Sequence, residues 1–96
     1  MKDKTGRMLE LRRLGVLEQL RLFKALGPEL SENRAYVGLA RIAAAVAMVD
    51  GVPLPFPTNE AAIEAALERL GEVGADAVGK VLLAEQEIDL AAEAGN

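Results

Sequence analysis

Hydrophobic positions change their spacing several times along the chain, and each change predicts a new element. Near the N-terminus, Leu9 and Leu11 alternate with charged residues, a period of two that is typical of a short strand. The preceding stretch DKTGR has Asp at the first position of a tight turn and Gly at the fourth. We therefore expect a strand or hairpin arm over residues 1–13, which needs a helix or a second subunit to cover it.

From Gly15 onward the period becomes that of an amphipathic helix. Val16, Leu20 and Phe23 fall on one face, which Leu17 and Leu26 flank, and the charged residues Glu18, Arg21 and Lys24 lie away from it. The apolar face of such an amphipathic helix is expected to pack inward. The pair Gly27-Pro28 predicts the end of the helix, because Gly readily adopts a positive φ and Pro cannot continue the helical hydrogen bonding.

A second helix is predicted after a short connector, with Ser31 or Asn33 as its N-terminal cap. Its sequence, RAYVGLARIAAAVAMVD, is apolar around most of its circumference, and residues 14–50 are together predicted as helices. A helix of this kind is buried on most sides. It is therefore the central helix of the domain, or one side of it meets another subunit.

The proline-rich segment VPLPFP, within residues 51–57, cannot continue that helix. Its prolines lack a backbone donor and force the residues before them toward extended conformations. We expect an extended strap in which alternation directs Val52, Leu54 and Phe56 to similar surroundings. Either this strap covers the helical core, or Leu54 or Phe56 is exposed and contacts a partner. We prefer the first interpretation.

Residues 58–96 are predicted as the C-terminal helices. Thr58 is the expected cap of a helix that ends at Gly71, and a further helix is expected from about Ala75, with an acidic end that frays. The inward stripe of the first of these helices consists of Ile63, Ala66, Leu67 and Leu70. The patterns predict one mainly α domain over residues 1–96, with about four to five helices and a short N-terminal β-strand or hairpin.

Charge is distributed unequally along this chain of net charge −4. Residues 1–48 carry nine Lys or Arg against five acidic residues (+4), and residues 49–96 carry two against ten (−8). Opposite charges on the two halves allow copies to stack head to tail in a ring or a spiral, although both halves can equally be simply solvated. Abundant Ala and only three aromatic residues predict a thin core, which also favours a homo-oligomer.

Acidic residues recur every four positions on the helix after the strap. Glu60, Glu64 and Glu68 share its outer face, either as a solvated ridge or as a surface for a basic partner, such as the arginines of a neighbouring copy. The candidate partner-binding residues are Arg34, Arg41, Leu54, Phe56, Glu60, Glu64 and Glu68.

The chain lacks the residues on which most catalysis depends. It has no His and no Cys, and its few Ser and Thr residues are explained by turns and caps. Its glycines do not form a phosphate loop, and carboxylates spaced along one exposed helix do not converge on a metal. We predict no enzymatic activity, no cofactor and no metal. Without a signal peptide, a membrane span or Cys, a cytoplasmic setting fits best.

The order of elements is more distinctive than any single residue. The stretches GRMLELRRL, LEQLRLFKALG, NRAYVGLARIAAAVAMVDGVPLPFP and TNEAAIEAALERLGEVGADAV, over roughly residues 6–78, resemble the small tail assembly chaperones of tailed bacteriophages and prophages. The segment VDGVPLPFPTNEAAIEAALERLGEVG is the most distinctive part. The resemblance implies a non-catalytic protein of the host bacterial cytoplasm that binds the tape measure protein and is absent from the mature virion. This chain would be the short form, without a frameshifted extension.

An alternative hypothesis is a small DNA-associated regulator that uses the basic N-terminal half. Arg7, Arg12 and Arg13 form a basic patch that Arg21 and Lys24 extend. Against this hypothesis, the net charge is negative and no aromatic residues interleave with the basic ones.

Overall fold

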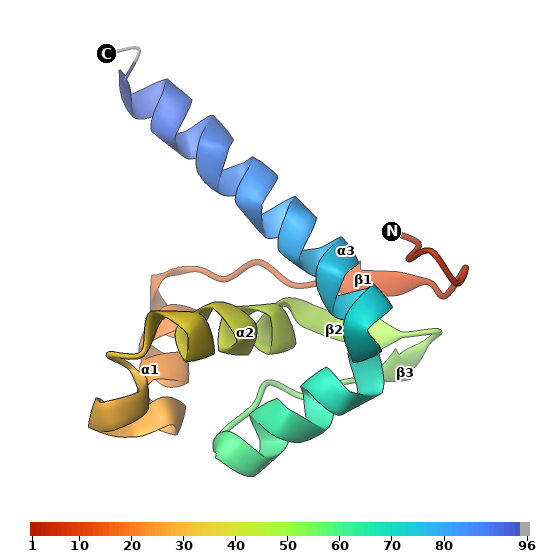
Figure 1. The fold of residues 1–96 in the computed structure, drawn as a ribbon, viewed down its shortest axis with the longest axis horizontal. Helices are drawn as coiled ribbons and strands as arrows, with labels where there is room; N and C mark the ends of the chain where they lie inside the picture. The colour runs from red at the N-terminus through yellow and green to blue at the C-terminus, as the bar shows by residue number, and fades with distance from the viewer. Residues whose placement is uncertain (95–96) are drawn as a thin grey trace.

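The chain folds into a small, mainly helical domain with one antiparallel sheet (Figure 1). A computed structural model describes the backbone of residues 1–94 and the side chains of residues 1–85. The elements of this part of the chain are β1 (Leu9–Leu11), α1 (Val16–Leu30), α2 (Arg34–Ala45), β2 (Val46–Val49), β3 (Val52–Pro53) and α3 (Glu60–Ala94). The mainly α prediction is confirmed, but there are three helices here rather than four or five.

The difference in helix number arises at two glycines. Gly27 (φ 80°, ψ 172°) and Gly71 (φ 67°, ψ −179°) have non-helical backbone inside α1 and α3, so each helix is bent where an end was predicted. The helix expected from Ala75 is the continuation of α3 beyond Gly71, and it projects from the body of the domain (Figure 1). The predicted acidic C-terminal end has its side chains outside the described residues.

Residues 46–49 form strand β2, which corrects the prediction that the helix continues to Asp50. In β2, Val49 pairs with Leu9 of β1 and with Val52 of β3. Asp50 and Gly51 form the two-residue turn between β2 and β3, with φ of 49° and 78°. Positive φ at both positions is the geometry of a type I′ hairpin, which Asp-Gly favours strongly. Residues 46–49 form a strand rather than a helix because their backbone groups then pair with the N–H and C=O groups of β1, which would otherwise lack hydrogen-bond partners.

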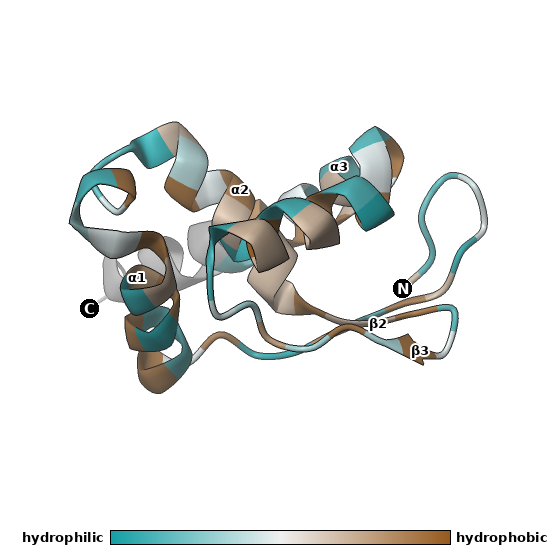
Figure 2. Ribbon diagram, turned by 90° about the horizontal axis from the view of Figure 1, so that it is seen from below, coloured by the Kyte–Doolittle hydropathy of each residue, from teal (hydrophilic) through white to brown (hydrophobic). Residues whose placement is uncertain are grey.

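The sheet has the order β1-β2-β3, and the helices pack on one side of it (Figure 2). The pairing of β1 with β2 shifts between Glu10 and Leu11, whose partners Met48 and Val46 skip Ala47 of β2, and a further bridge joins Lys2 to Met8. After β3, the Leu54 N–H still donates to the carbonyl oxygen of Ala47 at 2.8 Å. The strap thus begins as an edge strand, which tolerates Pro53 because that position needs no donor.

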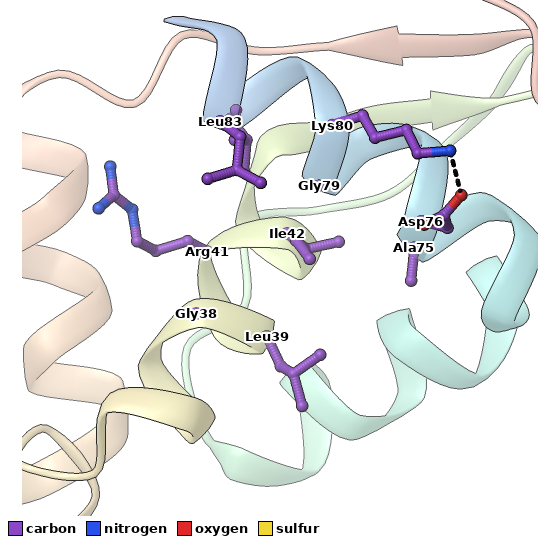
Figure 3. A pocket seen from close by; sticks show the side chains of 10 residues that line it. Gly38, Leu39, Arg41, Ile42, Ala75, Asp76, Gly79, Lys80 and Leu83 are labelled. Atoms are coloured by element: carbon purple, nitrogen blue, oxygen red, sulfur yellow. Dashed lines mark ion pairs between the residues drawn. The ribbon is translucent and has the colours of Figure 1, made fainter. Parts of the chain in front are cut away.

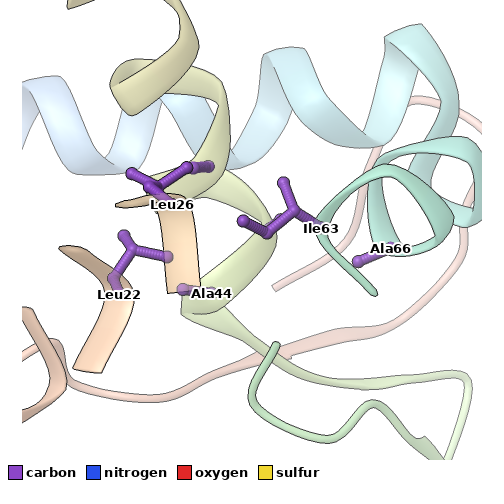
Figure 4. Close-up of a cluster of buried hydrophobic side chains, with 7 residues drawn as sticks. Leu22, Leu26, Ala44, Ile63 and Ala66 are labelled. Carbon is purple, nitrogen blue, oxygen red and sulfur yellow. The ribbon is translucent and has the colours of Figure 1, made fainter. Parts of the chain in front are cut away.

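Two small clusters of buried side chains form the core. The first joins α1, α2 and the first half of α3 through Leu22, Leu26, Ala44 and Ile63, among others (Figure 4). The second joins the sheet to α3 around its bend, and consists of Leu9, Ala45, Val46, Val49, Leu70 and Val78. Because α2 contributes mostly alanines, its neighbours approach closely but bury little area per residue.

Asparagine side chains cap two of the helices. Asn33 Oδ1 accepts a hydrogen bond from the Tyr36 N–H at 3.1 Å, which selects Asn33 over Ser31 as the cap of α2. Asn59 Oδ1 accepts from the Ala62 N–H at 2.8 Å, so the cap of α3 is Asn59 and not Thr58. Among the described residues, no helix is long and apolar enough to cross a membrane.

Candidate functional site: an exposed helix face and an apolar groove

One face of α1 leaves large apolar side chains in solvent. Val16, Leu17, Leu20 and Phe23 are 78%, 54%, 60% and 43% exposed, and we call these four residues the α1 stripe. This corrects the prediction that Val16, Leu20 and Phe23 pack inward. Figure 2 shows hydrophobic segments along α1 at the edge of the molecule.

The inward face of α1 is a different one. Leu22 and Leu26, which are 2% and 4% exposed, pack against α2 and the first half of α3. The helix is therefore apolar on two faces, and the spacing of its hydrophobic residues cannot decide which face packs inward. Arg21 and Lys24 are exposed, and at helical spacing they lie along one edge of the stripe.

A second apolar surface lies between α2 and the part of α3 beyond Gly71. It is a hollow of about 580 Å³, which we call the α2–α3 groove (Figure 3). Its lining residues are Gly38, Leu39, Arg41, Ile42, Ala75, Asp76, Gly79, Lys80, Leu82 and Leu83. Leu39 and Leu83 are 48% and 60% exposed, so both walls of the groove present apolar side chains to solvent.

Small residues keep this groove open. A Cβ placed on Gly38 meets no atom within 4 Å, so the space beside this residue is empty. At Gly79 a Cβ would lie 3.3 Å from Ile42 Cδ1, which shows that α3 approaches α2 closely there. A side chain added at Gly38, which lines the groove, would therefore begin in open space.

Charged groups border the groove on both walls. Arg41 lies on the α2 wall, and Asp76 and Lys80 form an ion pair of 3.0 Å on the α3 wall. Beyond Arg41 a second, more polar hollow of about 610 Å³ extends toward the start of α1. It is lined in part by Arg13 and Glu85.

The predicted partner-binding residues fall into three groups. Arg41 lies in the groove, whereas Arg34, Glu60, Glu64 and Glu68 are exposed but do not line it. Leu54 and Phe56 are half-buried against the first core cluster, so the strap covers the core. Val52 is exposed instead, which corrects the expectation that all three apolar strap residues share one environment.

Arg12 holds the strap in place. Its Nη2 donates to the carbonyl oxygen of Val46 at 3.1 Å and also to that of Leu54, and its guanidinium carbon lies 5.6 Å from the centroid of the Phe56 ring. Burial lowers the pKa of Arg12, but a guanidinium stays protonated in proteins. The side chain is therefore a cation that joins β2 to the strap.

Arg7 makes a similar connection between the N-terminal hairpin and α3. Its Nε lies 2.9 Å from Asp3 Oδ2, and its Nη1 and Nη2 donate to the carbonyl oxygens of Arg69 (3.0 Å) and Leu70 (2.5 Å). These are the last carbonyls before the bend at Gly71, where the helical hydrogen bonding stops. A cation at such a helix end is favourable.

Asp3 fixes the turn that presents Arg7. Its Oδ1 accepts hydrogen bonds from the Thr5 hydroxyl at 2.6 Å and from the backbone N–H groups of Thr5 and Arg7. The hydrogen bond from the Thr5 hydroxyl makes the largest contribution to lowering the pKa of Asp3. Burial raises this pKa, but the remaining bonds from Arg7 and the backbone also lower it, and the result is a pKa of about 2. The carboxylate is therefore charged at neutral pH.

Among the residues whose side chains are described, no group of three or more acidic side chains could hold a metal ion. A scan against protein-family models, a search of curated proteins and a search of solved structures each find no significant match to this chain. The α1 stripe and the α2–α3 groove therefore offer a ligand apolar contacts that are bordered by charged side chains.

Proposed function

We propose that this chain is a non-catalytic phage tail assembly chaperone that self-associates, binds the tape measure protein and keeps it from aggregating in the bacterial cytoplasm before the mature virion forms. The observation that carries the proposal is the α2–α3 groove, an open apolar surface on a chain whose own core is thin. Exposed apolar surface of this kind is typical of interaction sites.

The groove suits an amphipathic helix as its ligand. A helix in a groove binds through apolar side chains at positions i, i+3, i+4 and i+7. Leu39, Ile42 and Leu83 offer apolar contacts, and Gly38 and Gly79 allow a helix backbone to approach closely. An elongated helical client with several such faces would bind several copies of this chain.

The DNA-associated alternative has less support. Arg7 and Arg12 donate their hydrogen bonds to carboxylate and carbonyl groups of the same chain, so neither guanidinium is free for phosphates. Arg13, Arg21 and Lys24 remain exposed. A mobility shift of DNA that weakens steeply with salt would revive this alternative.

Co-expression with the tape measure protein of the same phage tests the proposal. We expect this chain to raise the soluble fraction of that client and to co-purify with it in several copies. Gly38→Gln, which adds a polar side chain on the α2 wall of the groove, is expected to abolish the rescue, and Val52→Gln, at an exposed apolar position outside the groove, is the matched control. A client that stays insoluble beside folded wild-type chain would refute the proposal.

A further inference from the structure

We propose that the α1 stripe of one copy docks in the α2–α3 groove of a second copy, and that a client helix competes with it for that groove. Only the second part of this inference, competition by a client helix, rests on the proposed function. Docking between copies can be tested with the purified chain alone.

The two surfaces have complementary shapes. The stripe is convex, because Val16, Leu20 and Phe23 follow one another on a single helix face at spacings of four and three residues. The groove is concave, with empty space at Gly38 and apolar walls. Each copy carries one surface of each kind, on different elements. Such a contact is heterologous, and it leads to rings or open chains of copies rather than to a two-fold dimer.

Charge gives the docked helix an orientation. Arg21 and Lys24 are exposed along one edge of the stripe. On the α3 wall of the groove, Asp76 is exposed and paired with Lys80, and Glu72, which does not line the groove, is exposed one turn earlier on α3. The α2 wall carries Arg41, which would repel the basic edge of the stripe. Lys80 already offsets the charge of Asp76, so we expect the basic edge of the stripe to face Glu72 on α3.

Three variants of the full chain separate the two surfaces without changing the net charge. Leu20→Gln combined with Phe23→Gln removes the centre of the stripe, where the two residues are 60% and 43% exposed. Gly38→Gln adds a polar side chain on the α2 wall of the groove, where its Cβ meets no atom within 4 Å. Val52→Gln replaces an exposed apolar residue outside both surfaces and is the control.

Sedimentation velocity over a concentration series gives the readout. We expect the wild type and Val52→Gln to associate reversibly, and the stripe and groove variants each to associate about thirtyfold more weakly, the loss typical of removing a central contact. An equal mixture of the stripe and groove variants should form a 1:1 dimer that does not grow. Each partner then retains one intact surface, and only one docking contact can form.

Several results would overturn the docking. One is a mixture that associates no better than its separate components, and another is a Gly38→Gln chain that assembles like the wild type, as expected if stripe packed on stripe. A wild type that stays monomeric throughout the series would also refute it. Correct folding of each variant is checked by far-UV circular dichroism and thermal unfolding.

The competing client has a separate outcome. In the co-expression assay the stripe variant should hold the tape measure protein at least as well as the wild type, because its grooves are not occupied by neighbours, whereas Gly38→Gln should lose it. If the mixture forms the dimer but no client is solubilised, docking stands and the proposed function fails. If the client is solubilised but the mixture stays monomeric, the proposed function stands and the docking between copies fails.

Discussion

The sheet side of this domain and its outer helical faces are built in opposite ways. Around the sheet, Arg7 and Arg12 donate to backbone carbonyls far away in sequence, and Val46 and Val49 of β2 are buried. On the outer faces, Leu20, Leu39 and Leu83 are 60%, 48% and 60% exposed.

This contrast separates what holds the fold together from what remains for binding. Polar contacts to backbone carbonyls fix the hairpin, the strap and the bend of α3 relative to one another, because hydrogen bonds from a guanidinium are directional. Exposed apolar side chains add little to the stability of the monomer, because their surface stays in water. They contribute favourable free energy only when a partner covers them. Substitutions on the two sides should therefore affect different measurements.

The largest effect on stability is expected in the core beneath both regions. Ile63 is fully buried where α1, α2 and α3 meet. Ile63→Ala should lower the free energy of unfolding by about 3 kcal/mol, through lost burial and the cavity left behind. Urea unfolding followed by circular dichroism measures this change. A loss below about 1 kcal/mol would show that the cluster is not packed as described.

A smaller loss is expected on the sheet side from Arg7→Ala. The substitution leaves the carbonyls of Arg69 and Leu70 without their donor, and removes the partner of Asp3. Because the Arg7 side chain is partly exposed, we expect a cost of about 1–2 kcal/mol in the free energy of unfolding. Arg21→Ala, on the open side, is the matched control and should change stability by less than about 0.5 kcal/mol. If Arg7→Ala and Arg21→Ala lowered the free energy of unfolding equally, the sheet side would not be held by Arg7 as described.

The contribution of Asp3 should depend on pH. Its pKa falls from 3.8 to about 2 on folding, so the ionised form stabilises the native state above about pH 4 and this stabilisation is lost as the pH falls toward 2. The difference in stability between wild type and Asp3→Asn should therefore be largest near neutrality and shrink over that window. Unfolding curves at several pH values give this difference. A constant difference would mean that the charge of Asp3 plays no part.

The smallest effect on stability is expected at the α1 stripe. Leu20→Gln changes a side chain that is 60% exposed, and should alter the free energy of unfolding by less than about 0.5 kcal/mol. The same change should weaken association between copies. A large loss of stability would show that Leu20 belongs to the core, and would contradict the difference described between the sheet side and the outer helical faces.

Local sequence signals alone are enough for much of this architecture. Alternation at Leu9 and Leu11 predicts β1, and Gly27 and Gly71 mark the two interruptions of the helices, because glycine adopts positive φ without a steric cost. The prolines of the strap predict its extended backbone in the same way. These features depend on the conformational limits of single residues, which are present in the sequence itself.

The tertiary structure decides the remaining features, because they depend on contacts between distant residues. The stretch Val46–Val49 follows a helical pattern, but pairing with β1 turns it into a strand, and Asp50-Gly51 was the local signal for that hairpin. In α1, two apolar faces could form the core, and it is Leu22 and Leu26 that pack in one cluster with Ile63 of α3. The hydrophobic pattern shows the α1 stripe as one apolar face, but only the fold shows that this face stays exposed. The α2–α3 groove exists only where the two helices come together.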